Sequence, residues 1–286
     1  MFAVLLMVVA CKSPLIEDDV TTDEPTTAVN AKTKKFTFTV KGDFGDAGFT
    51  RGYLTADGKE MTDLWLFDYV DNRLVQQIHQ TADDEDWGQP HLALTYGQHH
   101  IYFVASRGDT PVIDEENPII SWNIVRDTFW KDYEVSVVST SNGNRAVTLD
   151  RVVTKLRICV ADEVPVGCAT VSVTPERWYY GLNYMTGQAA AAKRQAIDVA
   201  VPDSYVGTTG TLAVNVFGLS GADEWTTNVT VTAKDGNGGE IGSVVINGVP
   251  FKRNRASEYS GNLFGSVGTM GVSVNGDWED SVSGTW

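Results

Sequence analysis

Four histidines and three cysteines are the residues of this 286-residue chain that could bind a metal ion or act as nucleophiles. His99 and His100 are adjacent on an expected strand, so their side chains point to opposite faces and cannot bind one ion together. His79 and His91 are isolated, and no histidine lies in an HExxH, CxxC or GxSxG context. We therefore expect no metal site among the histidines.

Carboxylates are abundant, but their spacing does not favour a catalytic or calcium site. The acidic loop at 83–86 has four consecutive carboxylates that cannot all point inward, which favours a solvated face over a Ca²⁺ site. The DGNGGE segment at 235–240 lacks the polar fifth residue of a calcium loop, which favours a hairpin turn. A glycosidase carboxylate pair stays open as a minor alternative, because sequence spacing gives no distances. No glycine-rich phosphate loop follows a strand, so we expect no cofactor and no enzyme.

Two cysteines in the second half of the chain could form a disulfide. Cys159 and Cys168 lie on either side of residues 160–167, which include Pro165 and Gly167. If the flanking segments paired as a hairpin, the two Cβ atoms would be close enough for a bond, and secretion would permit it. The alternative is two unpaired small apolar residues.

The third cysteine follows an apolar run typical of a signal peptide. Residues 2–10 are uncharged and apolar, about half the roughly 20 residues of a spanning helix. The run ends in Ala10 before Cys11, which is similar to a bacterial lipobox. We expect a signal peptide at 1–10 and a diacylated Cys11 that holds the protein on the outer membrane at the cell surface. One departure is that no Lys or Arg precedes the run.

A flexible tether is expected at 11–32, because this stretch has two prolines, many threonines and no hydrophobic period. Its acidic residues at 17–19 are similar to the charged tract of surface-exposed lipoproteins, although ordinary linker charge explains them equally well. The whole chain has 22 Lys and Arg against 37 Asp and Glu, a net charge of −15. Such a charge repels a phosphate backbone, so we expect no nucleic-acid partner.

The remaining sequence predicts an all-β protein. Phe36, Phe38 and Val40 alternate with polar residues, and segments 63–70 and 74–79 flank a turn at 71–73 that predicts a hairpin. Similar short strands recur at 99–106, 134–139, 146–149, 151–160, 168–173, 212–218, 228–234, 242–248 and 270–276. Their spacing favours β-sandwiches, with domains at 33–150 and 151–286. Short helical turns stay open in the alanine-rich segment 188–195 and in 117–130.

The order of these segments resembles a known family. The lipobox and tether, LWLFDYVDNRLV at 64–75, GQHHIYFVA at 97–105, RVVTKLRICV at 151–160, FKRNRASEY at 251–259 and the tail at 275–286 together are similar to the fimbrillin and FimB-type anchor lipoproteins of Bacteroidales type V pili. The resemblance implies two tandem transthyretin-like antiparallel β-sandwich domains. It also implies a fimbrial subunit that joins other pilus subunits by β-strand exchange.

Two roles within that family stay open. The short tether favours a lipid-anchored anchor or accessory subunit. The family's shaft subunits are instead cut by a protease after a basic residue near the first strand, and Arg51, before Gly52, lies roughly where a shaft or tip subunit carries that residue. A loop arginine in a glycine-rich turn is the simpler explanation.

Two further groups of residues could contact partners. Lys252, Arg253 and Arg255 form the strongest positive cluster of the acidic chain and could contact a neighbouring subunit, although a solvated sheet edge is the simpler explanation. Exposed aromatic rings stack on sugars, so Trp178, Tyr179 and Tyr180 keep open a surface glycan-binding lipoprotein with a host or microbial ligand. In sandwiches such rings more often belong to the core.

Overall fold

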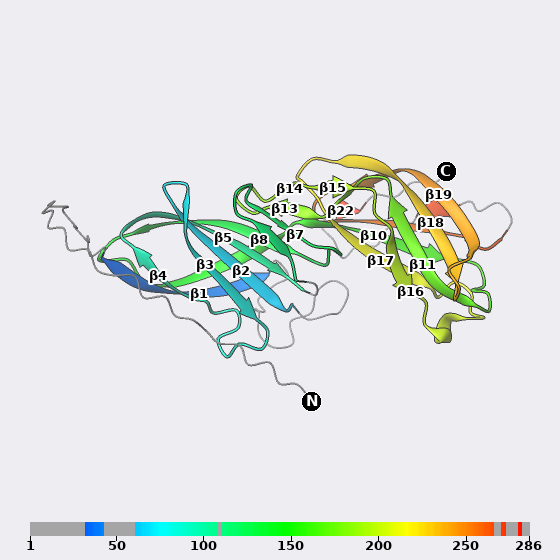
Figure 1. Cartoon of the computed structure of the whole chain (residues 1–286), viewed down its shortest axis with the longest axis horizontal. Helices are drawn as coiled ribbons and strands as arrows, with labels where there is room; N and C mark the ends of the chain where they lie inside the picture. The colour runs from blue at the N-terminus through cyan, green and yellow to red at the C-terminus, as the bar shows by residue number, and fades with distance from the viewer. Residues whose placement is uncertain (1–31, 43–60, 108–109, 266–269, 273–279, 282–286) are drawn as a thin grey trace, which may run out of the picture. The chain divides into compact units, whose positions relative to one another are not determined.

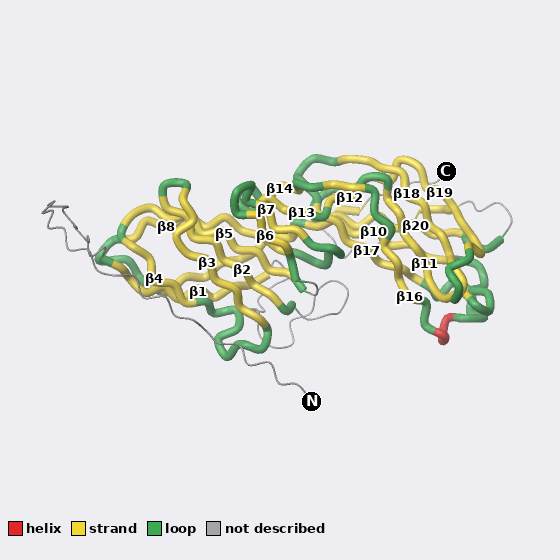
Figure 2. Tube along the Cα trace, in the orientation of Figure 1, coloured by secondary structure: helices red, strands yellow, loops and turns green. Residues whose placement is uncertain are grey.

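Strands dominate the computed structural model, which describes residues 32–42, 61–107, 110–265, 270–272 and 280–281 (Figures 1 and 2). Among these residues the only helix is a single 3₁₀ turn, Asp203–Tyr205. The all-β prediction is therefore confirmed. No described helix is long and apolar enough to span a bilayer.

The N-terminal half forms a seven-stranded sheet. Its order is β3 (Arg73–Thr81), β2 (Asp63–Val70), β5 (Gly97–Ser106), β8 (Phe129–Val137), β9 (Asn144–Arg151), β1 (Thr33–Gly42) and β4 (His91–Thr95). Only two ladder pairs join β8 to β9, so the sheet folds over there and encloses one apolar core. Phe36, Phe38 and Val40 reach this core, because alternate residues of β1 face inward as the period-two pattern predicts.

The predicted hairpin between β2 and β3 is confirmed. Its turn residues Asp71 and Asn72 have φ angles of 49° and 59°. These left-handed values are those of a two-residue type I′ turn, whose twist matches that of the strands, and Asp and Asn tolerate them better than most residues.

The C-terminal half contains two further sheets. One has the order β17 (Ala213–Leu219), β10 (Val153–Val160), β20 (Arg255–Gly261) and β21 (Met270–Val272), and β22 (Asp280–Ser281) also pairs with β20. The other has the order β16 (Ile197–Ala200), β11 (Cys168–Pro175), β18 (Trp225–Asp235) and β19 (Glu240–Phe251). The apolar faces of both sheets contribute to a second core, and the predicted turn at 235–240 joins β18 to β19.

Short strands complete the described chain. They are β6 (Val112–Asp114), β7 (Ile119–Ser121), β13 (Gly181–Asn183) and β14 (Gln188–Ala189) in one small sheet, and β12 (Trp178–Tyr179) paired with β15 (Ala192–Lys193). The helical turns left open at 188–195 and 117–130 do not form, because these segments contain strands instead. Cross-strand pairing overrides the helical preference of the alanines, because the backbone of 188–193 is bonded to β13 and β12.

A third apolar cluster joins the two halves. Tyr69 and Tyr102 of the N-terminal sheet belong to the same buried cluster as Phe217 and Leu219 of β17. The chain from residue 32 onward accordingly forms one compact unit. Strand β9 ends at Arg151 and β10 begins at Val153. The domain bounds at 33–150 and 151–286 stay a sequence-based prediction.

Candidate functional site

Strand β1 is the first strand of the described chain and fills the N-terminal core with three side chains. Phe36, Phe38 and Val40 are each no more than 1% exposed. The Phe38 ring packs edge-on against Phe103 and Tyr133, with centroids 5.4 and 5.6 Å away. A strand that left this position would therefore expose an apolar groove.

The backbone of β1 is paired on both sides. Residues 33–37 run antiparallel to β4, whereas residues 37–42 run parallel to β9. The first strand of the C-terminal half, β10, likewise runs parallel to β20. Loss of β1 would leave unpaired N–H and C=O groups along β9, which is the surface that a complementing strand needs.

The predicted lipidation and processing residues lie outside the described part of the chain. Cys11, Arg51 and Gly52 belong to ranges whose placement is not described, and so does the signal peptide. They stay sequence-based predictions.

The predicted platform of aromatic rings does not form, because Trp178 is a core residue. Its side chain is 1% exposed and its Nε1 donates a hydrogen bond to the Phe217 carbonyl at 3.1 Å. The indole packs on Gly218, where a Cβ atom would come within 2.5 Å of the ring. Trp178 cannot stack on a sugar without disrupting this packing.

The two tyrosines that follow are half-buried and contact cations. The Arg177 guanidinium lies 4.8 Å from the Tyr179 ring centroid, and Trp225 packs edge-on against the same ring. The Lys193 ammonium lies 4.3 Å from the Tyr180 centroid. Cations therefore lie over both rings, which is a second feature unfavourable to sugar stacking.

The predicted basic cluster is directed into the protein. Arg255 is 9% exposed and pairs with Glu224, while Arg253 donates hydrogen bonds to the carbonyls of Ser220 and Gly187. Burial lowers the pKa of Arg253. Lys252 is half-buried beside them. The two arginines each have an internal partner, which does not favour a subunit contact, and that contact stays a sequence-based prediction.

The hairpin on which a Cys159–Cys168 disulfide would depend does not form. Cys159 lies on β10 and Cys168 on β11, and these strands belong to different sheets. Both cysteines are free thiols. Burial raises the pKa of both thiols, and the Glu258 carboxylate adds to the effect at Cys159. The strand pairing that a Cys159–Cys168 disulfide would need is therefore absent between β10 and β11.

The adjacent histidines diverge as predicted. His99 is 1% exposed, and its Nδ1 lies 2.7 Å from the buried Asp68 carboxylate while its Nε2 lies 2.9 Å from the Thr95 carbonyl. A carbonyl oxygen only accepts hydrogen bonds, so Nε2 is the donor there. Burial raises the pKa of Asp68, partly offset by the contact with His99.

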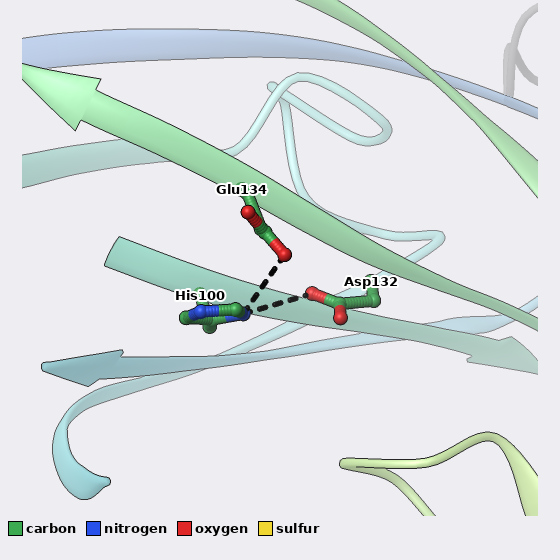
Figure 3. A group of neighbouring side chains, drawn as sticks. All are labelled: His100, Asp132 and Glu134. Atoms are coloured by element: carbon green, nitrogen blue, oxygen red, sulfur yellow. Dashed lines mark ion pairs between the residues drawn. The ribbon is translucent and has the colours of Figure 1, made fainter. Parts of the chain in front are cut away.

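His100 faces a different group of side chains, shown in Figure 3. Its Nδ1 lies 3.5 Å from Asp132 Oδ1 and 3.8 Å from Glu134 Oε1. The ligand atoms of these three residues all lie within 4.8 Å of one another. Sequence reasoning missed this group. The i, i+2 spacing of the two acids shows that they share a strand face, but only the pairing of β5 with β8 brings His100 opposite Glu134.

The acidic loops are turns capped by their own side chains. Asp84 accepts a hydrogen bond from the Thr81 amide, Asp114 from those of Glu116 and Asn117, and Asp235 from those of Asn237 and Gly239. The carboxylates therefore order their own loops, as short polar side chains do in turns.

The sequence profile of a family described as "Family of unknown function (DUF6562)" matches residues 113–285, more than half of the chain. The chain belongs to this family. No curated protein sequence matches it.

Several solved structures share the fold. A fimbrial assembly protein from Parabacteroides distasonis aligns with a TM-score of 0.50 at 10% identity, over 84% of this chain and 95% of its own. A candidate polysaccharide-binding protein from Bacteroides thetaiotaomicron aligns with a TM-score of 0.52 at 10% identity, over 83% and 95%. A candidate adhesin from Bacteroides ovatus aligns with a TM-score of 0.51 at 10% identity, over 86% and 94%. The resemblance to fimbrillin-type proteins is thus confirmed for the fold.

Proposed function

We propose that this protein is a cell-surface fimbrial subunit with a structural rather than an enzymatic role. In this proposal the lipid on Cys11 holds it to the outer membrane, and complementing strands join it to other pilus subunits. The observation that carries the proposal is the position of β1, the first strand of the described chain, which buries three side chains and pairs parallel to β9. The shared fold of a fimbrial assembly protein supports it.

A strand in this position is suited to exchange. It brings Phe36, Phe38 and Val40 to the core from one side of a short segment, so an incoming strand with the same alternation fills the same groove. The parallel pairing requires no hairpin between β1 and β9, so a strand from another chain can make the same ladder.

Anchor and shaft roles differ in the fate of the segment after β1. Arg51 follows the end of β1 by nine residues, and cleavage after it would separate β1 covalently from β2. We propose the anchor or accessory role, in which the bond stays intact and β1 stays in its own sandwich. The processed shaft or tip subunit is the alternative.

Intact mass and N-terminal sequencing of the protein from its native envelope test the proposal, with and without a trypsin-like protease. We expect a diacylated Cys11 N-terminus in fibre-associated protein. A new N-terminus at Gly52, abolished by Arg51→Ala but not by the matched Lys59→Ala, would show a processed shaft or tip subunit instead. A lipidated monomer that never associates with fibres would contradict the fimbrial proposal and favour glycan binding.

A further inference from the structure

The contact that His100 makes with carboxylates differs from those of two other histidines of this chain. His79 Nε2 lies 2.8 Å from Asp63 Oδ1 and His99 Nδ1 lies 2.7 Å from Asp68 Oδ1, which are hydrogen-bond distances. His100 Nδ1 is 3.5 and 3.8 Å from its two carboxylates, beyond the usual N–H···O range. His100 therefore lies between two carboxylates and is hydrogen-bonded to neither.

The atoms that face each other across this space are buried. His100 Nδ1 and Asp132 Oδ1 are both shielded from solvent, and neither has a hydrogen-bond partner among the described residues. Folded proteins leave few such atoms unpaired and use a water or an ion where no protein group serves. The two atoms point to a bound species between them.

The two distances from His100 Nδ1 and the chemistry of the three ligand groups suit a metal ion. The ligand atoms of a tetrahedral zinc ion with bonds of about 2.0–2.2 Å lie about 3.3–3.6 Å apart, close to the 3.5 and 3.8 Å found at His100. Imidazole nitrogen with carboxylate oxygen suits zinc and its neighbours in the first transition row, whereas Ca²⁺ takes six to eight oxygens. We propose that His100, Asp132 and Glu134 bind a divalent transition-metal ion.

The site is built on central strands of the sheet. Glu134 is the register partner of His100, and Asp132 is the partner of Tyr102, two residues further along β5. The Tyr102 ring stacks on the imidazole, with centroids 6.2 Å apart and planes at 23°, which holds the orientation of the imidazole. The pairing of β5 with β8 therefore positions all three ligands, and no loop has to become ordered to form the site.

One side of the site is open to solvent. The side chains of His100 and Glu134 are 44% and 74% exposed. Zinc sites that accept a water or an outside ligand have three protein ligands and a fourth coordination position open to solvent, as here. The ion can therefore bind a further group from solvent or from a neighbouring molecule.

Titration of the full chain with zinc chloride against a chromophoric chelator tests the proposal. We expect one equivalent of zinc to bind. His100→Gln and Glu134→Gln should each weaken zinc affinity by more than about 10-fold. Mutation of residues that only support metal ligands already costs about 10-fold in affinity, and these two residues are proposed as ligands themselves. Cobalt(II) in place of zinc adds a visible d–d spectrum that both variants should lose.

His79→Gln is the matched control, because His79 contacts one carboxylate rather than two. This variant should bind zinc like the wild-type chain. Glu134 is exposed, so its substitution should leave the circular dichroism spectrum unchanged. The proposal is overturned if the wild-type chain binds no zinc, or if His79→Gln weakens binding as much as His100→Gln.

Discussion

Asp68 is a buried titratable side chain whose ionisation is coupled to folding. Its carboxyl is 2% exposed and contacts the equally buried His99. Burial raises the pKa of Asp68 above its ordinary value of 3.8, so folding favours the protonated acid. The stability that Asp68 contributes is complete below pH 3.8 and is lost as the pH rises through the higher folded-state pKa.

We predict that Asp68→Asn removes this pH dependence. The amide keeps the shape of the side chain and its contact with His99 but cannot ionise. The unfolding free energy of the variant relative to wild type should therefore rise between pH 4 and pH 7, as measured by urea titration at each pH. Asp71→Asn, at an exposed turn position, is the control and should show no such trend. If the difference in unfolding free energy between Asp68→Asn and wild type stayed constant between pH 4 and pH 7, the raised pKa of Asp68 would not be the source of the pH dependence.

Strand β1 fills the groove that cleavage after Arg51 would open in a processed subunit, and we expect its inward side chains to hold it in place. Phe38 is fully buried between Phe103 and Tyr133, whereas Thr39 faces solvent. We predict that Phe38→Ala lowers the unfolding free energy by about 3–5 kcal/mol, because it removes a large core side chain and leaves a cavity.

Thr39→Ala is the matched substitution on the opposite face of the same strand, and we expect it to change stability by less than about 0.5 kcal/mol. Denaturant titration measures both. Equal losses for the two variants would show that β1 is held by its backbone ladder rather than by its side chains.

A buried ion pair in the N-terminal half positions a hydrogen bond that reaches the C-terminal half, in addition to the third apolar cluster. Arg151, at the end of β9, pairs with both oxygens of Asp127 at 2.8 and 3.1 Å. The same guanidinium donates to Asn254, in the turn before β20, at 3.1 Å. Asp127 is fully buried and Arg151 is 6% exposed. One side chain thus links the N-terminal sheet to the C-terminal half.

We predict that Asp127→Ala destabilises the whole chain by about 3–5 kcal/mol, because it leaves the Arg151 charge buried without its carboxylate. The comparison is Lys131→Ala, which breaks the exposed Lys131–Asp150 pair and should cost less than about 1 kcal/mol. Calorimetric unfolding checks both values. If Asp127→Ala cost no more than Lys131→Ala, the buried pair would not be a major source of stability.

Local patterns in the chain were enough to predict much of this fold. Alternation predicted that Phe36, Phe38 and Val40 face a core, because the side-chain period of a strand is two residues. The Asp71–Asn72 turn predicted its hairpin for a similarly local reason. Adjacency alone showed that His99 and His100 diverge.

Only the tertiary structure decided which strands meet. Cys159 and Cys168 are close in the chain but lie in different sheets, whereas His100 and Glu134 are far apart in the chain and adjacent across a ladder. The burial of Trp178 likewise depends on the small residue Gly218 of another strand. Sheet order and register are set by contacts between distant segments, which no local period encodes.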